Sequence, residues 1–123
     1  MSSSSLPPGW PGAVRPPGTP DWQRSAVGWL LDQCPPEYRG HPVLLRHPVA
    51  LAVLAGHHVQ AGLLVCRRAL ATARSQLAED LSQTAMAELL EVLQVEQARL
   101  IATGRSVGLV EQALRGQRYV PRL

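Results

Sequence analysis

Several residue types are missing from this 123-residue chain: it has no lysine, no asparagine and no phenylalanine, and Ile101 is its single isoleucine. Alanine, leucine, valine, arginine, proline and glycine are abundant instead, which is the usage expected of a GC-rich genome. All twelve residues of the lysine and arginine class are arginines, and we attribute this to the codon usage of such a genome. Their identity alone does not indicate a phosphate or nucleic-acid ligand, although arginine suits such ligands well.

Cysteine is scarce, and a targeting segment is missing. Cys34 and Cys66 lie far apart and form no CxxC spacing. The N-terminus lacks the cationic region and apolar run of a secretory signal. The longest stretch of low charge, residues 48–66, carries glycine, histidine and glutamine in its middle and is too polar for a good membrane span. We expect a cytoplasmic protein with reduced thiols and no membrane association.

Motifs for catalysis or metal binding are also absent. The sequence has no glycine-rich phosphate loop, no zinc-ligand spacing and no HExxH pattern. Adjacent His57 and His58 point about 100° apart on a helix, and neither has another histidine or cysteine three or four residues away. Cys66 falls in an apolar helical seam, and Cys34 at a helix end where the dipole disfavours a thiolate. We therefore predict no enzyme, no catalytic residue, no metal site and no cofactor.

Proline, glycine and serine dominate the first twenty residues. Six prolines and three glycines occur between residues 7 and 20. Proline removes backbone donors and glycine raises chain entropy, so we predict a disordered arm over residues 1–19. A helical domain is expected over 20–117, followed by a C-terminal tail over 118–123.

A short helix is predicted at about residues 20–33. Thr19-Pro20-Asp21 has the order of a helix start, with Thr19 as the capping residue and proline at the first helical position. Cys34-Pro35-Pro36 ends the segment. The following residues up to Pro48 are interpreted as a connector.

Two apolar seams follow, and each has a seven-residue repeat. The repeats comprise Leu63, Leu70 and Leu77 in the first seam and Met86, Leu93, Leu100, Val107 and Leu114 in the second. Their phase changes between residues 77 and 86, where acidic and hydroxyl residues favour caps and turns. We predict an all-α fold built on an antiparallel helical hairpin of about 48–80 and 84–115 with coiled-coil-like seams. One continuous helix is the alternative, because no glycine or proline marks the turn.

The expected hairpin brings small residues together. With a turn near residue 82, position i faces position 164 − i, which sets Gly104 and Gly108 opposite residues 56–60. Small residues permit close approach of two helices. A packing role is the first interpretation, and a notch for a partner is the second.

More apolar residues are present than one hairpin can cover. Those expected on its outer sides are Leu51, Leu54, Leu64, Val65, Val92, Val95 and Ile101. The N-terminal helix, with Trp22 and Trp29, can cover part of this surface. The remainder predicts self-association into a homodimer with a four-helix arrangement.

The open end of the hairpin and the chain ends carry the predicted binding residues. The predicted register brings Arg39 and Arg46 towards Arg115, Arg118 and Arg122, which makes this end basic. Such a pole can receive a nucleic-acid backbone or an acidic protein tail, or can be merely solvated.

Trp10 is an aromatic residue within the proline-rich arm, and it forms either a short recognition motif or a contact folded back on the domain. Tyr119 lies in the basic and apolar tail. The leading hypothesis is a non-catalytic protein–protein interaction module in which Trp10, Arg115, Arg118, Tyr119 and Arg122 bind the partner. The alternative is a nucleic-acid-associated accessory factor that uses the basic pole.

Overall fold

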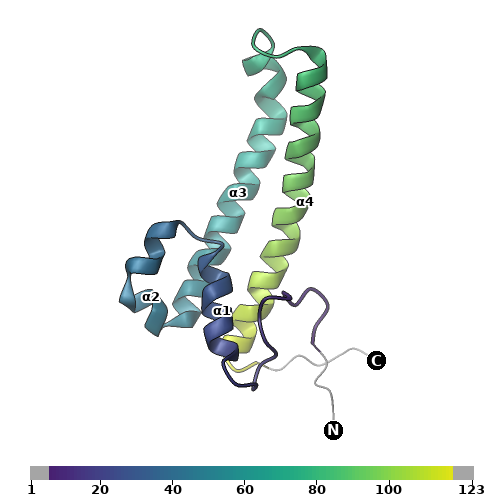
Figure 1. Ribbon diagram of the computed structural model, residues 1–123. Helices are drawn as coiled ribbons and strands as arrows, with labels where there is room; N and C mark the ends of the chain where they lie inside the picture. The colour runs from purple at the N-terminus through teal and green to yellow at the C-terminus, as the bar shows by residue number, and fades with distance from the viewer. Residues whose placement is uncertain (1–5, 118–123) are drawn as a thin grey trace.

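The computed structural model describes residues 6–117, which contain helices and turns and no strand. The helices follow in the order α1 (Trp22–Leu31), the 3-10 helix η1 (Pro36–Gly40), α2 (Pro42–Arg46), α3 (Pro48–Leu77) and α4 (Gln83–Leu114). Helices α3 and α4 form a long antiparallel hairpin, and α1, η1 and α2 lie beside its open half (Figure 1). The predicted all-α class, with a hairpin and a short N-terminal helix, is confirmed.

The turn of the hairpin lies between Leu77 and Ser82, within the predicted break. The backbone N–H groups of Asp80 and Leu81 both donate to the Leu77 carbonyl. The Ser82 hydroxyl then accepts from the Ala85 N–H at 3.1 Å and caps α4. Because the chain reverses here, the continuous-helix alternative is wrong.

Removal of this cap is expected to weaken the hairpin measurably. Substitution of Ser82 by Ala should lower the free energy of unfolding by about 1 kcal/mol, because the Ala85 N–H loses its acceptor. Urea unfolding followed by circular dichroism measures this change. Ser75→Ala, at an exposed serine inside α3, is the control and should change the free energy by less than about 0.5 kcal/mol. An equal loss in both variants would contradict the capping role.

The register of the hairpin follows from three close approaches between glycines and aliphatic side chains. A β-carbon at Gly62 would lie 3.2 Å from Leu100 Cδ1, one at Gly104 would lie 3.5 Å from Val59 Cγ1, and one at Gly56 would lie 3.8 Å from Val107 Cγ1. The numbers of facing residues thus add to 162 or 163, close to the predicted 164. Gly104 fills the expected packing role, whereas the space beside Gly108 is open within 4 Å.

Helix α1 begins later than predicted, and its start differs in chemistry. Asp21 is the residue before the helix and has a left-handed backbone, with φ of 63° and no capping hydrogen bond from its side chain. The predicted cap at Thr19 is wrong, because its hydroxyl donates instead to the Pro16 carbonyl at 2.6 Å. That bond belongs to the turn that ends the arm.

The arm packs against the domain in its described part, residues 6–20. It has no helix or strand, as its proline content predicts, but Val14 is only 3% exposed. The Trp10 indole N–H donates to the Val14 carbonyl at 2.8 Å, and the Ser106 hydroxyl of α4 donates to the Gly9 carbonyl at 2.6 Å. Residues 6–19 therefore have no regular element but are held against the helices by these contacts. The contacts with the helices offset the entropy of ordering the arm.

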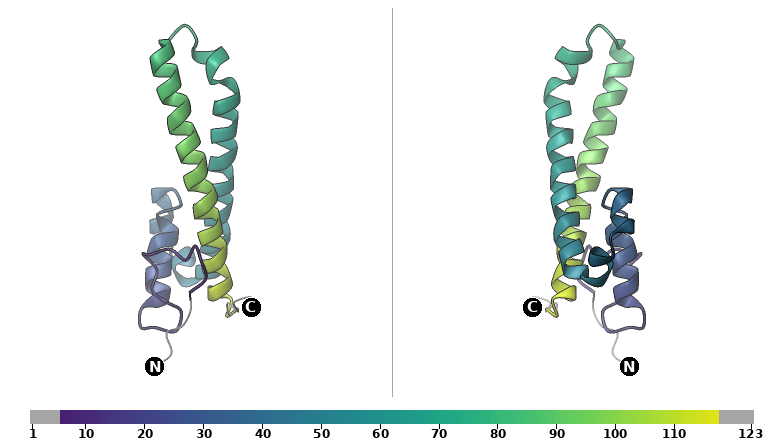
Figure 2. Two further views of the ribbon diagram at one scale, coloured as in Figure 1. Left: turned by 90° about the vertical axis from the view of Figure 1, so that its right-hand side faces the viewer. Right: turned by 90° about the vertical axis from the view of Figure 1, so that its left-hand side faces the viewer.

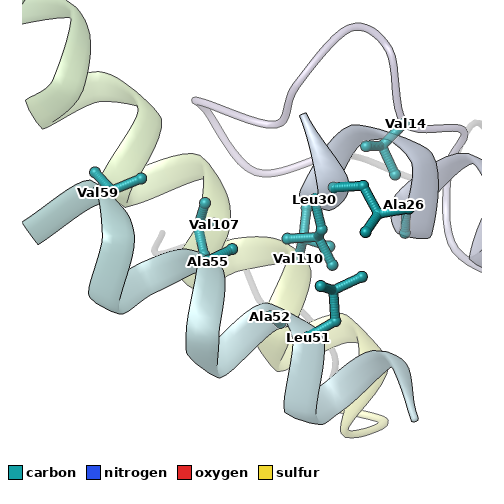
Figure 3. Packing of buried hydrophobic residues seen from close by; sticks show 10 residues of the cluster. Val14, Ala26, Leu30, Leu51, Ala52, Ala55, Val59, Val107 and Val110 are labelled. Carbon is teal, nitrogen blue, oxygen red and sulfur yellow. The ribbon is translucent and has the colours of Figure 1, made fainter. Parts of the chain in front are cut away.

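The core occupies the open half of the hairpin. Figure 3 shows Val14 of the arm together with Ala26 and Leu30 of α1, set against side chains of α3 and α4. The buried residues of this cluster are Val14, Ala26, Leu30, Leu31, Leu51, Ala52, Ala55, Val59, Val107 and Val110. Towards the turn, Leu63, Cys66 and Ala73 continue the buried seam between α3 and α4.

The connector between α1 and α3 forms the short helices η1 and α2. It is fixed to α3 by Tyr38, whose hydroxyl oxygen lies 2.7 Å from His58 Nε2. The two rings also meet edge to face, with centroids 5.2 Å apart. Helix α1, η1 and the arm thus form a third layer that stops partway along the hairpin (Figure 2).

Candidate interaction surface

The histidines are dispersed over the open half of the molecule. His41 and His47 lie at the ends of α2 and are exposed, His57 is exposed on α3, and His58 contacts Tyr38. Within residues 6–117 no three side chains of His, Cys, Asp or Glu are grouped as metal ligands would be. The prediction that the protein uses no metal stays a prediction.

Neither cysteine has the surroundings of an activated nucleophile. Burial raises the pKa of the Cys34 thiol, and the nearby positive charge of Arg39 lowers it by a smaller amount. Cys34 is therefore held as the neutral thiol at neutral pH, which is the poorly reactive form. Cys66 is 5% exposed in the apolar seam, as its position in the repeat predicted.

A depression at the turn also lacks catalytic groups. It opens to solvent beside the Ser82 cap and is lined by Arg74, Ala78, Leu81, Ser82, Gln83, Met86 and Ala87. No imidazole, thiol or carboxylate is among these side chains. Its lining therefore offers no side chain that could act as a general base.

The predicted binding residues lie in different surroundings. Trp10 is half-buried against the core, so the fold-back interpretation describes its contacts in this structure. Arg115 is exposed and forms an ion pair with Glu111 at 3.1 Å. Arg118, Tyr119 and Arg122 lie outside the described residues.

The basic pole is partly neutralised by local acids. Arg39 forms an ion pair with Asp32, and Arg115 with Glu111, so each brings its own counter-charge. Arg46 ends α2, which packs on α3 and η1. An exposed arginine that already has an acidic neighbour adds little to a long-range positive field. The nucleic-acid alternative stays a prediction.

The third layer covers some of the apolar residues expected on the outer sides of the hairpin and leaves the others exposed. Leu51 is fully buried in the cluster that contains Ala26 and Leu30 of α1, so the N-terminal helix covers this part of the outer surface, as predicted. Leu54 is half-buried, and Ile101 is 38% exposed. The four most exposed members are Leu64 at 64%, Val65 at 67%, Val92 at 63% and Val95 at 64%.

Three of these residues continue the face that the third layer covers. A seven-residue step on a helix rotates the side chain by only about 20°. Val65 is seven residues beyond His58, the residue that Tyr38 of η1 covers. On α4, Val92 is two such steps from Ser106, and Val95 is two steps from Leu109.

The N-terminal arm contacts both Ser106 and Leu109 through Gly9. Val65, Val92 and Val95, here called the valine face, therefore extend the packed face beyond the end of the layer that covers it. Figures 1 and 2 show this part of the hairpin without a third layer.

Charges of both signs border the valine face on α4. Glu96 and Arg99 form an exposed ion pair in which the Arg99 Nε and Nη2 atoms donate to the carboxylate. The hydrogen bond from Arg99 lowers the pKa of Glu96. Glu88 is exposed one helical turn before Val92.

Helix α3 is long and apolar enough, by length and composition alone, to cross a membrane. A third of its most apolar stretch is buried inside the protein. A core helix of a soluble domain has the same properties, so the helix does not determine where the protein resides.

No protein-family model, no curated protein and no solved structure matches this chain.

Proposed function

We propose that this protein is a non-catalytic helical interaction module and that the valine face binds a protein partner. The supporting observation is the position of Val65, Val92 and Val95, which lie 63–67% exposed on the face that packs against the arm and η1 elsewhere. Single exposed aliphatic residues are common on monomers. Three on the uncovered continuation of a packed face have the arrangement of an interaction site.

The charge around the face favours a protein over a lipid surface. Helices that lie on membranes carry mostly basic residues on their polar side, which anionic headgroups attract. The turn half of the hairpin instead carries both signs, with Arg67, Arg68 and Arg74 on α3 and Glu88, Glu91, Glu96 and Arg99 on α4. These acids repel an anionic membrane, whereas a mixture of both signs can pair with a protein surface.

Site-specific photocrosslinking in cells that produce the protein tests this proposal. A photoreactive amino acid at position 92 should form a covalent adduct with a protein, because Val92 is 63% exposed on this face. The same amino acid at position 64 is the matched control, since Leu64 is equally exposed at 64% but lies outside the face. Adducts identified by mass spectrometry should be frequent at 92 and at least about tenfold rarer at 64. Equal yields, or adducts with lipid alone, would refute the proposed function.

A further inference from the structure

Two of the charged residues near the valine face, Glu88 and Arg99, are placed symmetrically about its centre and have opposite signs, whereas the same centre relates Glu91 to Glu96, which have like charge. Glu88 lies four residues before Val92, and Arg99 lies four residues after Val95. The midpoint of both pairs is the bond between Leu93 and Gln94. If the helix is reversed about this point, Val92 and Val95 exchange positions. Glu88 and Arg99 also exchange positions, so an acid then lies where a base was. A surface with this property is complementary to itself, as a two-fold interface requires.

We propose that the valine face binds a second copy of this chain, antiparallel, about a two-fold axis that passes between Leu93 and Gln94. This inference rests on the proposed function and names the partner of the same surface. In this arrangement α4 lies against α4 of the second copy, and α3 against α3. Val92 of each copy meets Val95 of the other, and Glu88 of each faces Arg99 of the other.

The charges fit this arrangement without loss of the existing ion pair. Arg99 uses its Nε and Nη2 atoms for Glu96 within its own chain. Its Nη1 group still carries two donor protons for Glu88 of the second copy. The two copies therefore gain two equivalent ion pairs at the ends of the valine contacts.

The shape of the molecule also fits, because the third layer ends where the second copy must end. The arm begins to cover α4 at Ser106. The length of α4 between the axis and Ser106 is about 12 residues, or roughly 19 Å. From the axis to the turn at Ser82 is about 11 residues, or roughly 17 Å. The turn of the second copy thus reaches the level of the arm, and its hairpin occupies the part of the face that the third layer leaves uncovered.

On α3 the same axis falls beside a small residue. The hairpin register sets the midpoint of α4 level with Ala69. Ala69 is partly exposed, and its short side chain permits close approach of the two α3 helices. A two-fold axis parallel to the helices is excluded by the third layer, since α1 of both copies would then occupy the same space between the hairpins.

Size-exclusion chromatography with light scattering on the purified full chain tests the arrangement. The wild type should elute with twice the mass of the chain. Val92→Glu should raise the dissociation constant at least about a hundredfold, since a charge is buried in the interface without a partner. Leu64→Glu, at an equally exposed residue outside the face, should leave the dimer intact. Circular dichroism confirms that each variant remains helical.

A charge exchange tests the antiparallel direction independently. Glu88→Arg alone should weaken the dimer about tenfold, because two arginines then oppose each other at both ends. Combination with Arg99→Glu should restore dimerisation to within about threefold of the wild type. This rescue occurs only if positions 88 and 99 face each other between copies.

Three results would overturn the inference: a monomer at all concentrations, a dimer that tolerates Val92→Glu, or failure of the charge exchange to restore binding. None of them refutes the proposed function by itself. A monomeric purified chain whose position 92 crosslinks to a different protein in cells would retain the interaction module and remove the second copy as its partner. Adducts of position 92 with lipid alone would refute both the protein-interaction function and the second copy as its partner.

Discussion

Deletion of residues 1–20 should lower the free energy of unfolding by about 3 kcal/mol or more. The arm contributes Val14, which is 3% exposed, and burial of a valine contributes about 1.5–3 kcal/mol. It also contributes Trp10 against the core and the hydrogen bond between Ser106 and Gly9, with about 1 kcal/mol for such a bond. Urea unfolding of the truncated and full chains, followed by circular dichroism, measures the difference.

Substitutions at two neighbouring residues test whether the contacts of the arm stabilise the protein without any change in the length of the arm. Val14→Asp should reproduce most of the loss, because the carboxylate must enter an apolar site. Ala13→Asp, at an exposed residue, should change the free energy of unfolding by less than about 0.5 kcal/mol. If the truncated chain and Val14→Asp both unfold at the wild-type urea concentration, the packing of the arm does not contribute to stability.

Joint substitution of Leu93 and Leu100 by glutamate should unfold most of the protein. Both residues lie in the second apolar repeat, and Leu100 approaches Gly62 across the hairpin. The two changes remove apolar contacts and place two unpaired carboxylates in the seam, at a combined cost of about 5 kcal/mol. Single domains have a total stability of about 5–15 kcal/mol, so little is left. Circular dichroism should show a large loss of helix.

The control keeps the same helix and the same added charge. Gln94→Glu combined with Ala98→Glu places two carboxylates on exposed positions of α4 and should retain wild-type helicity. Wild-type helicity and oligomer size in the Leu93 and Leu100 variant would show that α3 and α4 do not need this seam. That result would contradict the hairpin itself.

Much of the fold was predictable because it depends on local repeats. The two seven-residue patterns gave α3 and α4, and their change of phase gave the turn at residues 78–82. The sum rule for facing residues followed from the turn and placed Gly104 opposite residue 60, one residue from its observed neighbour Val59. Cys66 was expected in the seam and lies there. These features depend on periodicity and caps, which residues close in sequence determine.

The arm, the start of α1 and the outer face could not be predicted in the same way. A proline-rich segment has no regular element, but whether it stays ordered depends on contacts such as Gly9 with Ser106, nearly a hundred residues away. Thr19 had two possible partners, and the turn with Pro16 took its hydroxyl. Leu51 and Val65 have the same apolar character and lie fourteen residues apart on one side of α3, yet one is buried and the other is 67% exposed.

The sequence by itself therefore determined the two long helices, their boundaries near the turn and the pairing of α3 with α4. Periodic burial and capping act within a few helical turns, so they can be read along the chain. The tertiary structure decided which outer residues are covered, because α1, η1 and the arm reach only as far as Ser106 and His58. The valine face exists because this third layer ends there, and the length of a layer is set by packing between segments far apart in the chain.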